Sequence, residues 1–288
     1  MKPHYVTSEY LERFISQAIA EDIGEGDHSS LATIPRDLQG HALLKIKQNG
    51  ILAGLELARE IFKKIDSKLV LLFNRNDGDQ VKAGEFAFEV KGSIRSILGA
   101  ERLVLNCMQR MSGIATYTNY LCKLIESTNA KILDTRKTTP NLRPLEKWAV
   151  TIGGGTNHRY ALYNMIMLKD NHVDCSGGIN NALNSAKDYL KQTRKQIKIE
   201  IETRNLDEVK EVLQTGGADI ILLDNMDSET MREAVNLIDG KIKTEASGGI
   251  TEENILEMAH TGVDYISIGA LTHSVKSMDM SLKAEIDK

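Results

Sequence analysis

The chain has 288 residues and a mass of 32.0 kDa, and at roughly 150 residues per domain this length corresponds to about two domains. Its 36 basic and 40 acidic side chains give a net charge of −4, and no long basic run occurs, which argues against a dedicated nucleic-acid binder. Aromatic residues make up only 5%, too few for a stacking platform that binds single-stranded nucleic acid.

The N-terminal sequence and the cysteines bear on the compartment. The first ten residues, MKPHYVTSEY, lack the apolar core of a secretory signal, and no apolar run approaches the ~20 residues that a membrane-spanning helix needs. The three cysteines, Cys107, Cys122 and Cys175, are odd in number and show no CxxC spacing. This usage argues against disulfides and a structural zinc site, so we expect a cytoplasmic protein without a membrane association.

The first part of the chain predicts a mixture of helices and strands. Residues 8–21 have apolar side chains at helical spacing and predict a helix whose start is capped by Thr7 or Ser8. Residues 40–100 predict mainly strands, with one helix near 54–65. Residues 99–127 predict two helices joined at Ser112-Gly113, because glycine in a helix interior costs about 1 kcal/mol.

From about residue 130, short apolar runs alternate with helical stretches. The six runs are AKILDTRK, YNMIMLKDNH, IKIEIET, ADIILLDN, IKTEASGG and VDYISIGA. The last four end near Glu202, Asp224, Ser247 and Gly269, at spacings of 22, 23 and 22 residues, which is typical of consecutive βα units. A full eight-stranded barrel needs ~250 residues, so the sequence predicts a short or incomplete barrel, with an open doubly wound sheet as the alternative.

Cationic side chains gather near the first two strand ends, where the active site of an α/β barrel lies. They are Arg136, Lys137, Arg143, His158, Arg159 and Lys169. Such a concentration in a negatively charged chain predicts an anionic ligand with more than one carboxylate or phosphate. A solvated basic face is the alternative, mainly for Arg143 and Lys147, which we place in loops.

The last two strand ends predict a second anion site. Ser247-Gly248-Gly249 and Gly269 stand where barrel loops often bind a phosphate through backbone N–H groups, and the following helix is expected to begin at Thr251. Close packing of the glycines is the alternative. The chain has no P-loop and no complete Rossmann glycine motif, so nucleotide binding of those types is unsupported.

Two acidic residues, Glu202 and Asp224, end neighbouring strands of the predicted barrel. Carboxylates that face a phosphate-rich ligand suggest Mg²⁺ shared with the substrate, or hydrogen bonds to sugar hydroxyls. Pairing of these acids with Lys198 or Lys243 is the structural alternative. His158 lacks the HExxH spacing of a zinc site.

A series of motifs runs in a fixed order along nearly the whole chain, from Glu21-Asp22 to Leu271. They are Glu101-Arg102-Leu103 with Asn106, Ser112-Gly113-Ile114-Ala115-Thr116, Asp134-Thr135-Arg136-Lys137-Thr138-Thr139-Pro140, Gly153-Gly154-Gly155-x-Asn157-His158-Arg159, Lys169-Asp170-Asn171-His172, Leu222-Leu223-Asp224-Asn225 and Glu245-Ala246-Ser247-Gly248-Gly249-Ile250. Together they resemble the signature of the quinolinate phosphoribosyltransferase family.

The resemblance implies a reaction and an architecture. Phosphoribosyl passes from 5-phosphoribosyl 1-pyrophosphate to quinolinate, which is decarboxylated, and the products are nicotinate mononucleotide, pyrophosphate and CO₂. The implied fold class is α/β, with an N-terminal α+β domain and an incomplete (β/α) barrel. We place the first at residues 1–112, with the tail 275–288 returning to it, and the barrel at 113–274. The resemblance also implies a homodimer in which Arg102 enters the partner's site.

Carried over by motif, each functional residue takes a role from the family. The quinolinate-binding residues are Arg102, Arg136, His158, Arg159 and Lys169. Those that bind 5-phosphoribosyl 1-pyrophosphate are Lys137, Glu202, Asp224, Ser247, Gly248, Gly249 and Gly269. Lys137, Lys169, Glu202 and Asp224 are implied to be catalytic, and Glu202 and Asp224 to meet Mg²⁺ directly or through the substrate.

Some positions depart from the family pattern: Asn141 stands where Gly commonly follows Thr-Thr-Pro, and His28-Ser29, Tyr160-Ala161 and Asn164 also differ. Three rival functions remain open from the sequence. They are a phosphoribosyltransferase that uses nicotinate, a Schiff-base lyase that uses Lys169, and a non-catalytic binder of pyridine carboxylates. Turnover of nicotinate, borohydride trapping, or binding without turnover would select among them.

Overall fold

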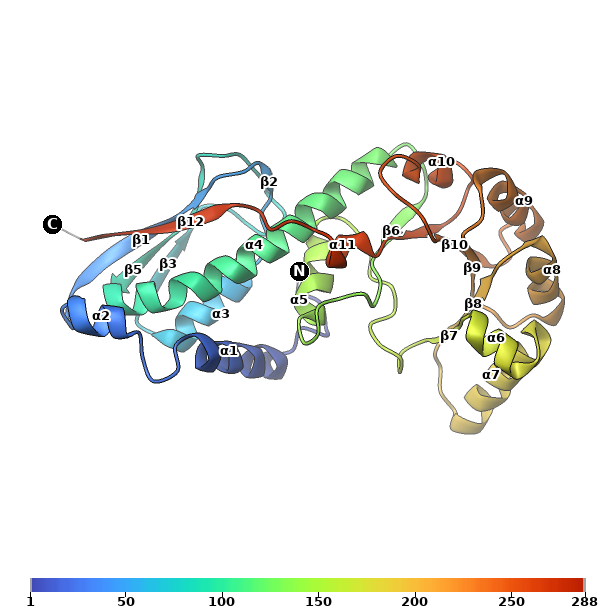
Figure 1. Ribbon diagram of the computed structural model, residues 1–288, viewed down its shortest axis with the longest axis horizontal. Coiled ribbons are helices and arrows are strands. Elements are labelled where there is room, and N and C mark those ends of the chain that lie inside the picture. Colours follow the sequence, from blue (N-terminus) through green and yellow to red (C-terminus); the bar gives the residue numbers. More distant parts are fainter. Residues whose placement is uncertain (1, 287–288) are drawn as a thin grey trace. The chain divides into compact units, whose positions relative to one another are not determined.

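The computed structural model describes residues 2–286 and divides the chain into two compact units (Figure 1). The first unit comprises the residues up to Asn119, Thr138–Gly154 and those from Leu271, and the second comprises Tyr120–Lys137 and Gly155–Ala270. These limits differ from the predicted division at residue 112, because helix α4 (Ile94–Leu124) continues through that position. Within residues 2–286, no helix is long and apolar enough to cross a membrane.

The first unit contains a four-stranded antiparallel sheet in the order β12-β1-β5-β3. Its strands are β1 (Gln39–Ile46), β3 (Val70–Phe73), β5 (Phe86–Ser93) and β12 (Met280–Ile286), and β2 (Gly50–Ile51) pairs separately with β4 (Gln80–Val81). The tail strand β12 pairs with β1 along its whole length, from Gly40 opposite Ile286 to Ile46 opposite Met280. The C-terminal tail therefore returns to the N-terminal sheet.

Two helices of this unit lie where the sequence predicts them, and one of the two packs against the sheet. Helix α1 (Ser8–Asp22) confirms the helix expected at 8–21, and the Thr7 side chain caps it by accepting from the backbone N of Tyr10. Helix α2 (His28–Thr33) follows, and α3 (Leu55–Ile65) confirms the helix expected near 54–65. The Phe62 ring of α3 meets the Phe88 ring of β5 edge to face at 5.9 Å, which seats α3 on the sheet.

The predicted joint at Ser112-Gly113 is wrong, because both residues lie inside the continuous helix α4. A Cβ atom at Gly113 would lie 2.2 Å from the carbonyl oxygen of Lys276. The glycine therefore admits the returning C-terminal backbone to the helix surface, and this contact outweighs its low helix propensity. Ser112 bonds to both backbone polar groups of Ala53.

The predicted loop positions of Arg143 and Lys147 are also wrong. Both residues belong to helix α5 (Arg143–Ile152), which has Pro144 in its first turn. Lys147 is fully buried, so it is no part of a solvated basic face.

Asn141, which departs from the family's glycine, has a backbone φ of +66° in the turn before α5. We expect Asn141→Ala to lower the free energy of unfolding by about 1 kcal/mol, because asparagine tolerates the left-handed conformation better than alanine does. Asn141→Gly should leave stability nearly unchanged. Urea unfolding of the two variants checks this, and equal losses in both would contradict it.

The second unit contains a six-stranded parallel sheet made of the six predicted runs. The strands are β6 (Lys131–Leu133), β7 (Ile166–Leu168), β8 (Ile199–Thr203), β9 (Ile220–Asp224), β10 (Lys243–Ser247) and β11 (Tyr265–Ser267). Their order is β6-β11-β10-β9-β8-β7, so sequence neighbours from β7 to β11 are also spatial neighbours. A doubly wound sheet reverses its strand order from the middle, so this order supports an incomplete barrel.

The connecting helices cover the outside of these strands (Figure 1). They are α6 (Asp170–Ser176), α7 (Ile179–Thr193), α8 (Leu206–Thr215), α9 (Ser228–Ile238) and α10 (Ile255–Ala259), with α11 (Ala270–His273) after the last strand. All five residues of β8 are buried, including Glu200 and Glu202. An acidic pair two residues apart on a buried strand turns both carboxylates to one side of the sheet.

Candidate active site

A cavity of about 500 Å³ opens at the carboxyl ends of the parallel strands, within the second unit. Its lining contains nine of the residues predicted from the sequence: Arg136, Lys137, His158, Arg159, Lys169, Glu202, Asp224, Ser247 and Gly248. The remaining lining residues are Asp134, Thr135, Met167, Leu222, Asn225, Glu245 and Ser267. The volume suits a small ligand, and the lining combines a cationic group with an acidic one.

Asp134, at the end of β6, fixes the segment that carries two of the cations. Its buried carboxylate accepts a hydrogen bond from the Asn157 amide at 2.6 Å and another from the backbone N of His158 at 2.9 Å. The same segment lies beside β6, since the backbone N of Thr156 donates to the carbonyl of Ile132. The carboxylate thus determines where Arg159 enters the cavity.

Arg159 is the most enclosed arginine of the cavity, with 8% of its surface exposed. Burial, and then the charge of Arg136, lower the pKa of Arg159, while Glu200 opposes both effects. Two guanidinium groups are therefore held close enough to repel each other. Such an arrangement is costly unless a ligand with negative charge binds there.

Lys169 and Glu202 meet across the ends of neighbouring strands β7 and β8. Lys169 Nζ lies 3.3 Å from Glu202 Oε2, and the lysine side chain is 47% exposed. Lys243, the alternative partner from the sequence, pairs instead with Asp264. Glu202 therefore faces the cavity and its cation.

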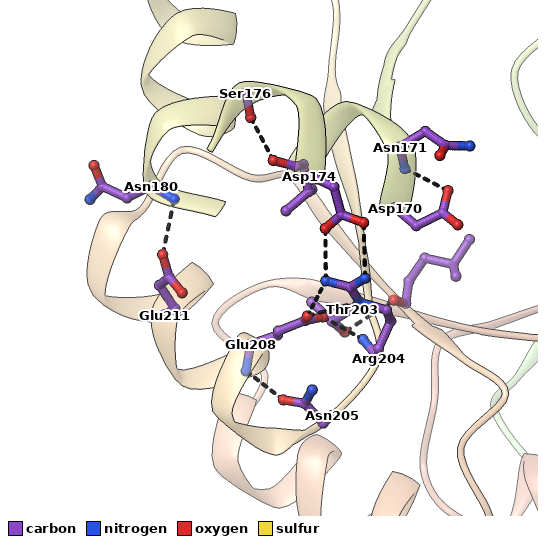
Figure 2. Close-up of polar contacts among 12 residues, drawn as sticks. Asp170, Asn171, Asp174, Ser176, Asn180, Thr203, Arg204, Asn205, Glu208 and Glu211 are labelled. Atoms are coloured by element: carbon purple, nitrogen blue, oxygen red, sulfur yellow. Dashed lines mark hydrogen bonds and ion pairs between the residues drawn. The ribbon is translucent and has the colours of Figure 1, made fainter. Parts of the chain in front are cut away.

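An arginine outside the cavity links the two elements that carry this pair (Figure 2). Helix α6 begins directly after Lys169, and Arg204 follows the end of β8. The Arg204 guanidinium donates to both carboxylate oxygens of Asp174 on α6, at 3.1 and 3.3 Å, and to Glu208 on α8 at 2.9 Å. This exposed network joins α6 and α8 to the segment that follows β8.

Gly248 brings its backbone against the end of β9. It has a φ of +87°, and a Cβ atom there would lie 2.3 Å from Asn225 Oδ1 and 2.9 Å from the Asn225 backbone N. Any side chain would displace Asn225, which donates to Asp224 at 2.6 Å. The glycine thus serves the close packing that the sequence left as an alternative, and it also shapes the wall of the cavity.

The helix expected at Thr251 begins instead at Ile255 and is short. The Asn254 side chain accepts from the backbone N of Thr251 at 2.8 Å and donates to the carbonyl of Gly249 at 3.1 Å, which forms a turn in place of a helical start. Gly249 and Gly269 are not among the lining residues, and exposed Arg102 belongs to the first unit.

A buried acidic pair at the base of the cavity was not among the residues predicted from the sequence. His158 Nε2 lies 2.8 Å from Glu200 Oε2 and 3.3 Å from Glu245 Oε2, and both acids are at most 1% exposed. A signal was available: Glu200 precedes Glu202 by two residues, and Glu245 precedes Ser247 by two. Strand side chains alternate between faces, so each acid shares the face of its cavity residue.

Burial alone lowers the pKa of His158, but the carboxylates of Glu200 and Glu245 outweigh it and raise the pKa to about 10. Burial, together with the neighbouring Glu245, raises the pKa of Glu200. His158 is therefore an imidazolium at neutral pH, and its titration is linked to that of Glu200.

This cluster predicts a pH dependence of stability. Above the ordinary histidine pKa of 6.5, the native chain retains a proton that the unfolded chain releases. The free energy of unfolding should therefore fall by about 1.4 kcal/mol per pH unit from pH 7 to 9, in addition to other groups. His158→Gln should lose this part of the slope. Urea unfolding at pH 7, 8 and 9 measures both, and identical slopes would contradict the prediction.

Comparisons with known proteins agree over both units. The family "Quinolinate phosphoribosyl transferase, N-terminal domain" matches residues 27–112, and the corresponding C-terminal domain matches residues 114–283. A chloroplastic nicotinate-nucleotide pyrophosphorylase [carboxylating] of Arabidopsis thaliana is 46% identical, over 96% of this chain and 83% of the relative. The probable Bacillus subtilis enzyme of that name is 42% identical, over 94% and 92% of the two chains. The solved nicotinate-nucleotide pyrophosphorylase of Francisella tularensis is 38% identical, with a TM-score of 0.92 over 97% of this chain and 98% of that one.

Proposed function

The chain belongs to the quinolinate phosphoribosyltransferase family, and on that premise we propose that it transfers phosphoribosyl from 5-phosphoribosyl 1-pyrophosphate to quinolinate with loss of CO₂. The observation that carries the proposal is the composition of one cavity. Arg136, Arg159 and Lys169 line it together with Glu202 and Asp224. A dianionic acid and a sugar phosphate need these two kinds of partner side by side.

The cationic side of the cavity suits quinolinate, which has two carboxylates on one pyridine ring. Arginine binds a carboxylate through two parallel hydrogen bonds, so Arg136 and Arg159 can fix the plane of the ring. Lys169 supplies a mobile point charge, which Glu202 holds at 3.3 Å until the substrate binds. His158 adds positive charge at the base of this group.

The acidic side suits the ribose and its pyrophosphate. Glu202 and Asp224 offer carboxylate oxygens, the donors that Mg²⁺ prefers, and two such groups are fewer than Mg²⁺ requires. They therefore fit an ion whose other ligands are substrate phosphates and water, and the ion would neutralise the leaving pyrophosphate. We assign the 5-phosphate to the loop of Ser247, Gly248 and Gly249, near Gly269, and Lys137 to the region between acid and sugar.

The chemistry needs positioning more than covalent catalysis. As the C1–pyrophosphate bond breaks, positive charge develops on the ribose, and the carboxylates of Glu202 and Asp224 stabilise it. The pyridine nitrogen donates its electron pair to C1. The ring nitrogen, now cationic, stabilises the electron pair that stays on the neighbouring ring carbon when the carboxylate leaves as CO₂, and a proton then binds to that carbon. The substrate itself therefore provides the stabilising charge.

The test is a parallel assay of the purified protein with quinolinate or nicotinate, each with 5-phosphoribosyl 1-pyrophosphate and Mg²⁺. We expect nicotinate mononucleotide from quinolinate alone. Product from nicotinate alone would keep the sugar-phosphate half of the proposal and overturn the acid half. A metal-free assay with chelator should abolish turnover, and unchanged turnover would overturn the Mg²⁺ assignment.

We further propose a homodimer in which Arg102 of one subunit reaches the site of the other. Arg102→Ala and Lys169→Ala proteins should each be inactive. When they are mixed at equal amounts and allowed to exchange, half of the dimers become mixed dimers with one intact site, so activity should recover to roughly a quarter of the wild-type value. Mixed dimers without activity would contradict a shared site.

The predicted cytoplasmic location stays a prediction. The name of the Arabidopsis thaliana relative places that protein in the chloroplast, and the chain has no membrane-spanning helix among the residues that the structure describes.

A further inference from the structure

We propose that Glu200 and Glu245 are positioning residues, which act through His158 to hold a positive charge and the adjoining Arg159 in place for an acidic substrate. The inference deepens the proposed function and rests on it for the identity of the acid. Neither glutamate has a role in the family carry-over, and neither was a candidate from the sequence.

The His158 ring is held by the two glutamates. Its Nε2 faces both carboxylates, at 2.8 Å from Glu200 and 3.3 Å from Glu245, and the side chain is only 7% exposed. A ring nitrogen engaged in this way cannot also bind a substrate carboxylate. The two glutamates come from strands β8 and β10, so they fix the ring from two separate elements.

The backbone of His158 is also held in place. The N–H of His158 is bound by Asp134 from β6, and Arg159 is the next residue in the chain. With the ring and the backbone of His158 both anchored, the position from which the Arg159 side chain starts is fixed by three strands. Loss of one of these contacts of His158 should make the position of Arg159 less well defined. It should leave the residues assigned to the sugar phosphate unchanged.

Charged groups surround His158 and Arg159. Asp134, Glu200 and Glu245 face His158 from three strands, while Arg159 and Arg136 lie on its cavity side. Glu200 also acts electrostatically on Arg159. Among the residues that the structure describes, Glu200 Oε1 has no hydrogen-bond partner, so this oxygen lies buried beside the cluster without a donor. The attraction between Glu200 and Arg159 opposes the repulsion between Arg159 and Arg136.

The variant that tests this is Glu245→Gln, which keeps the size of the side chain and leaves Glu200 to pair with His158. We expect the KM for quinolinate to rise on the order of 10-fold, with the KM for 5-phosphoribosyl 1-pyrophosphate within about twofold of wild type. Glu211→Gln, an exposed glutamate on the outer helix α8, is the matched control and should change neither constant. Equal increases in both KM values would overturn the proposal, since a general structural defect produces that result.

A second readout does not depend on activity. The ¹⁵N NMR chemical shifts of an imidazole show whether the ring is charged. The signal of His158 is identified as the one that is missing from the His158→Gln variant. His158 should remain an imidazolium at pH 8 in the wild type and become largely neutral in a Glu245→Leu, Glu200→Leu double variant at that pH. A neutral ring in the wild type would overturn the proposal, as would stoichiometric metal bound through Nε2. If quinolinate is not turned over but the ring is charged, the proposed function fails while the anchoring of His158 stands.

Discussion

Replacing Lys137 or Lys169 by alanine should lower kcat/KM with quinolinate by on the order of 10²–10³-fold each and leave the fold intact. Both side chains line the cavity. In the proposed mechanism, each supplies positive charge where the substrates develop or lose charge. Lys169 is 47% exposed and its single ion pair contributes little to folding. The free energy of unfolding should therefore change by less than about 1 kcal/mol.

Steady-state kinetics and urea unfolding of the same preparations separate the two effects. Lys210→Ala is the matched control, because Lys210 forms a surface pair with Asp207 at 2.7 Å, on the outer helix α8. It should retain full activity. Losses of activity and stability in proportion, for either cavity lysine, would mean that the residue supports the fold and not the chemistry.

Arg110→Ala should lower the free energy of unfolding by about 3–5 kcal/mol, the largest effect on stability that we expect from a single charged residue. The Glu146 side chain is 1% exposed and accepts from Arg110 Nη2 at 2.7 Å and from Nε at 3.1 Å. It also accepts two hydrogen bonds from Thr139. Without Arg110, the buried Glu146 carboxylate loses this ion pair and keeps the two hydrogen bonds from Thr139.

The control for this prediction is Arg204→Ala. Arg204 also forms a bidentate contact, with Asp174 (Figure 2). Its side chain, however, is 45% exposed. Its loss should cost less than about 1 kcal/mol. A double variant, Arg110→Met with Glu146→Gln, should recover part of the stability because it removes the stranded charge. If Arg110→Ala and Arg204→Ala lower the free energy of unfolding by the same small amount, burial does not determine how much these ion pairs contribute to stability.

The apolar periodicity within a short segment was enough to predict those helices and strands that are determined by their own residues. The six strands of the parallel sheet and helix α3 follow from apolar periodicity, since each element buries the face that its own residues define. The cavity residues follow from a general rule, because the carboxyl ends of parallel strands meet at one edge. Nine of the twelve proposed site residues meet in this way.

The features that the sequence did not predict depend on partners far away along the chain. Gly113 lies inside a helix because the backbone at Lys276 packs on it. The helix predicted to begin at Thr251 begins later, because the Asn254 side chain accepts the hydrogen bond from the backbone N of Thr251 and forms a turn there. Strand alternation places Glu200 and Glu245 on the cavity face, but it does not show that they pair with His158, because His158 lies in a loop far away along the chain.

The central claim is that this cavity couples phosphoribosyl transfer to the loss of one carboxylate. The most direct measurement uses quinolinate labelled with ¹⁴C in the carboxylate beside the ring nitrogen, with 5-phosphoribosyl 1-pyrophosphate and Mg²⁺. We expect one labelled CO₂ for each nicotinate mononucleotide formed, and none when 5-phosphoribosyl 1-pyrophosphate is omitted. Labelled CO₂ without the sugar phosphate, or nucleotide that retains the label, would contradict it.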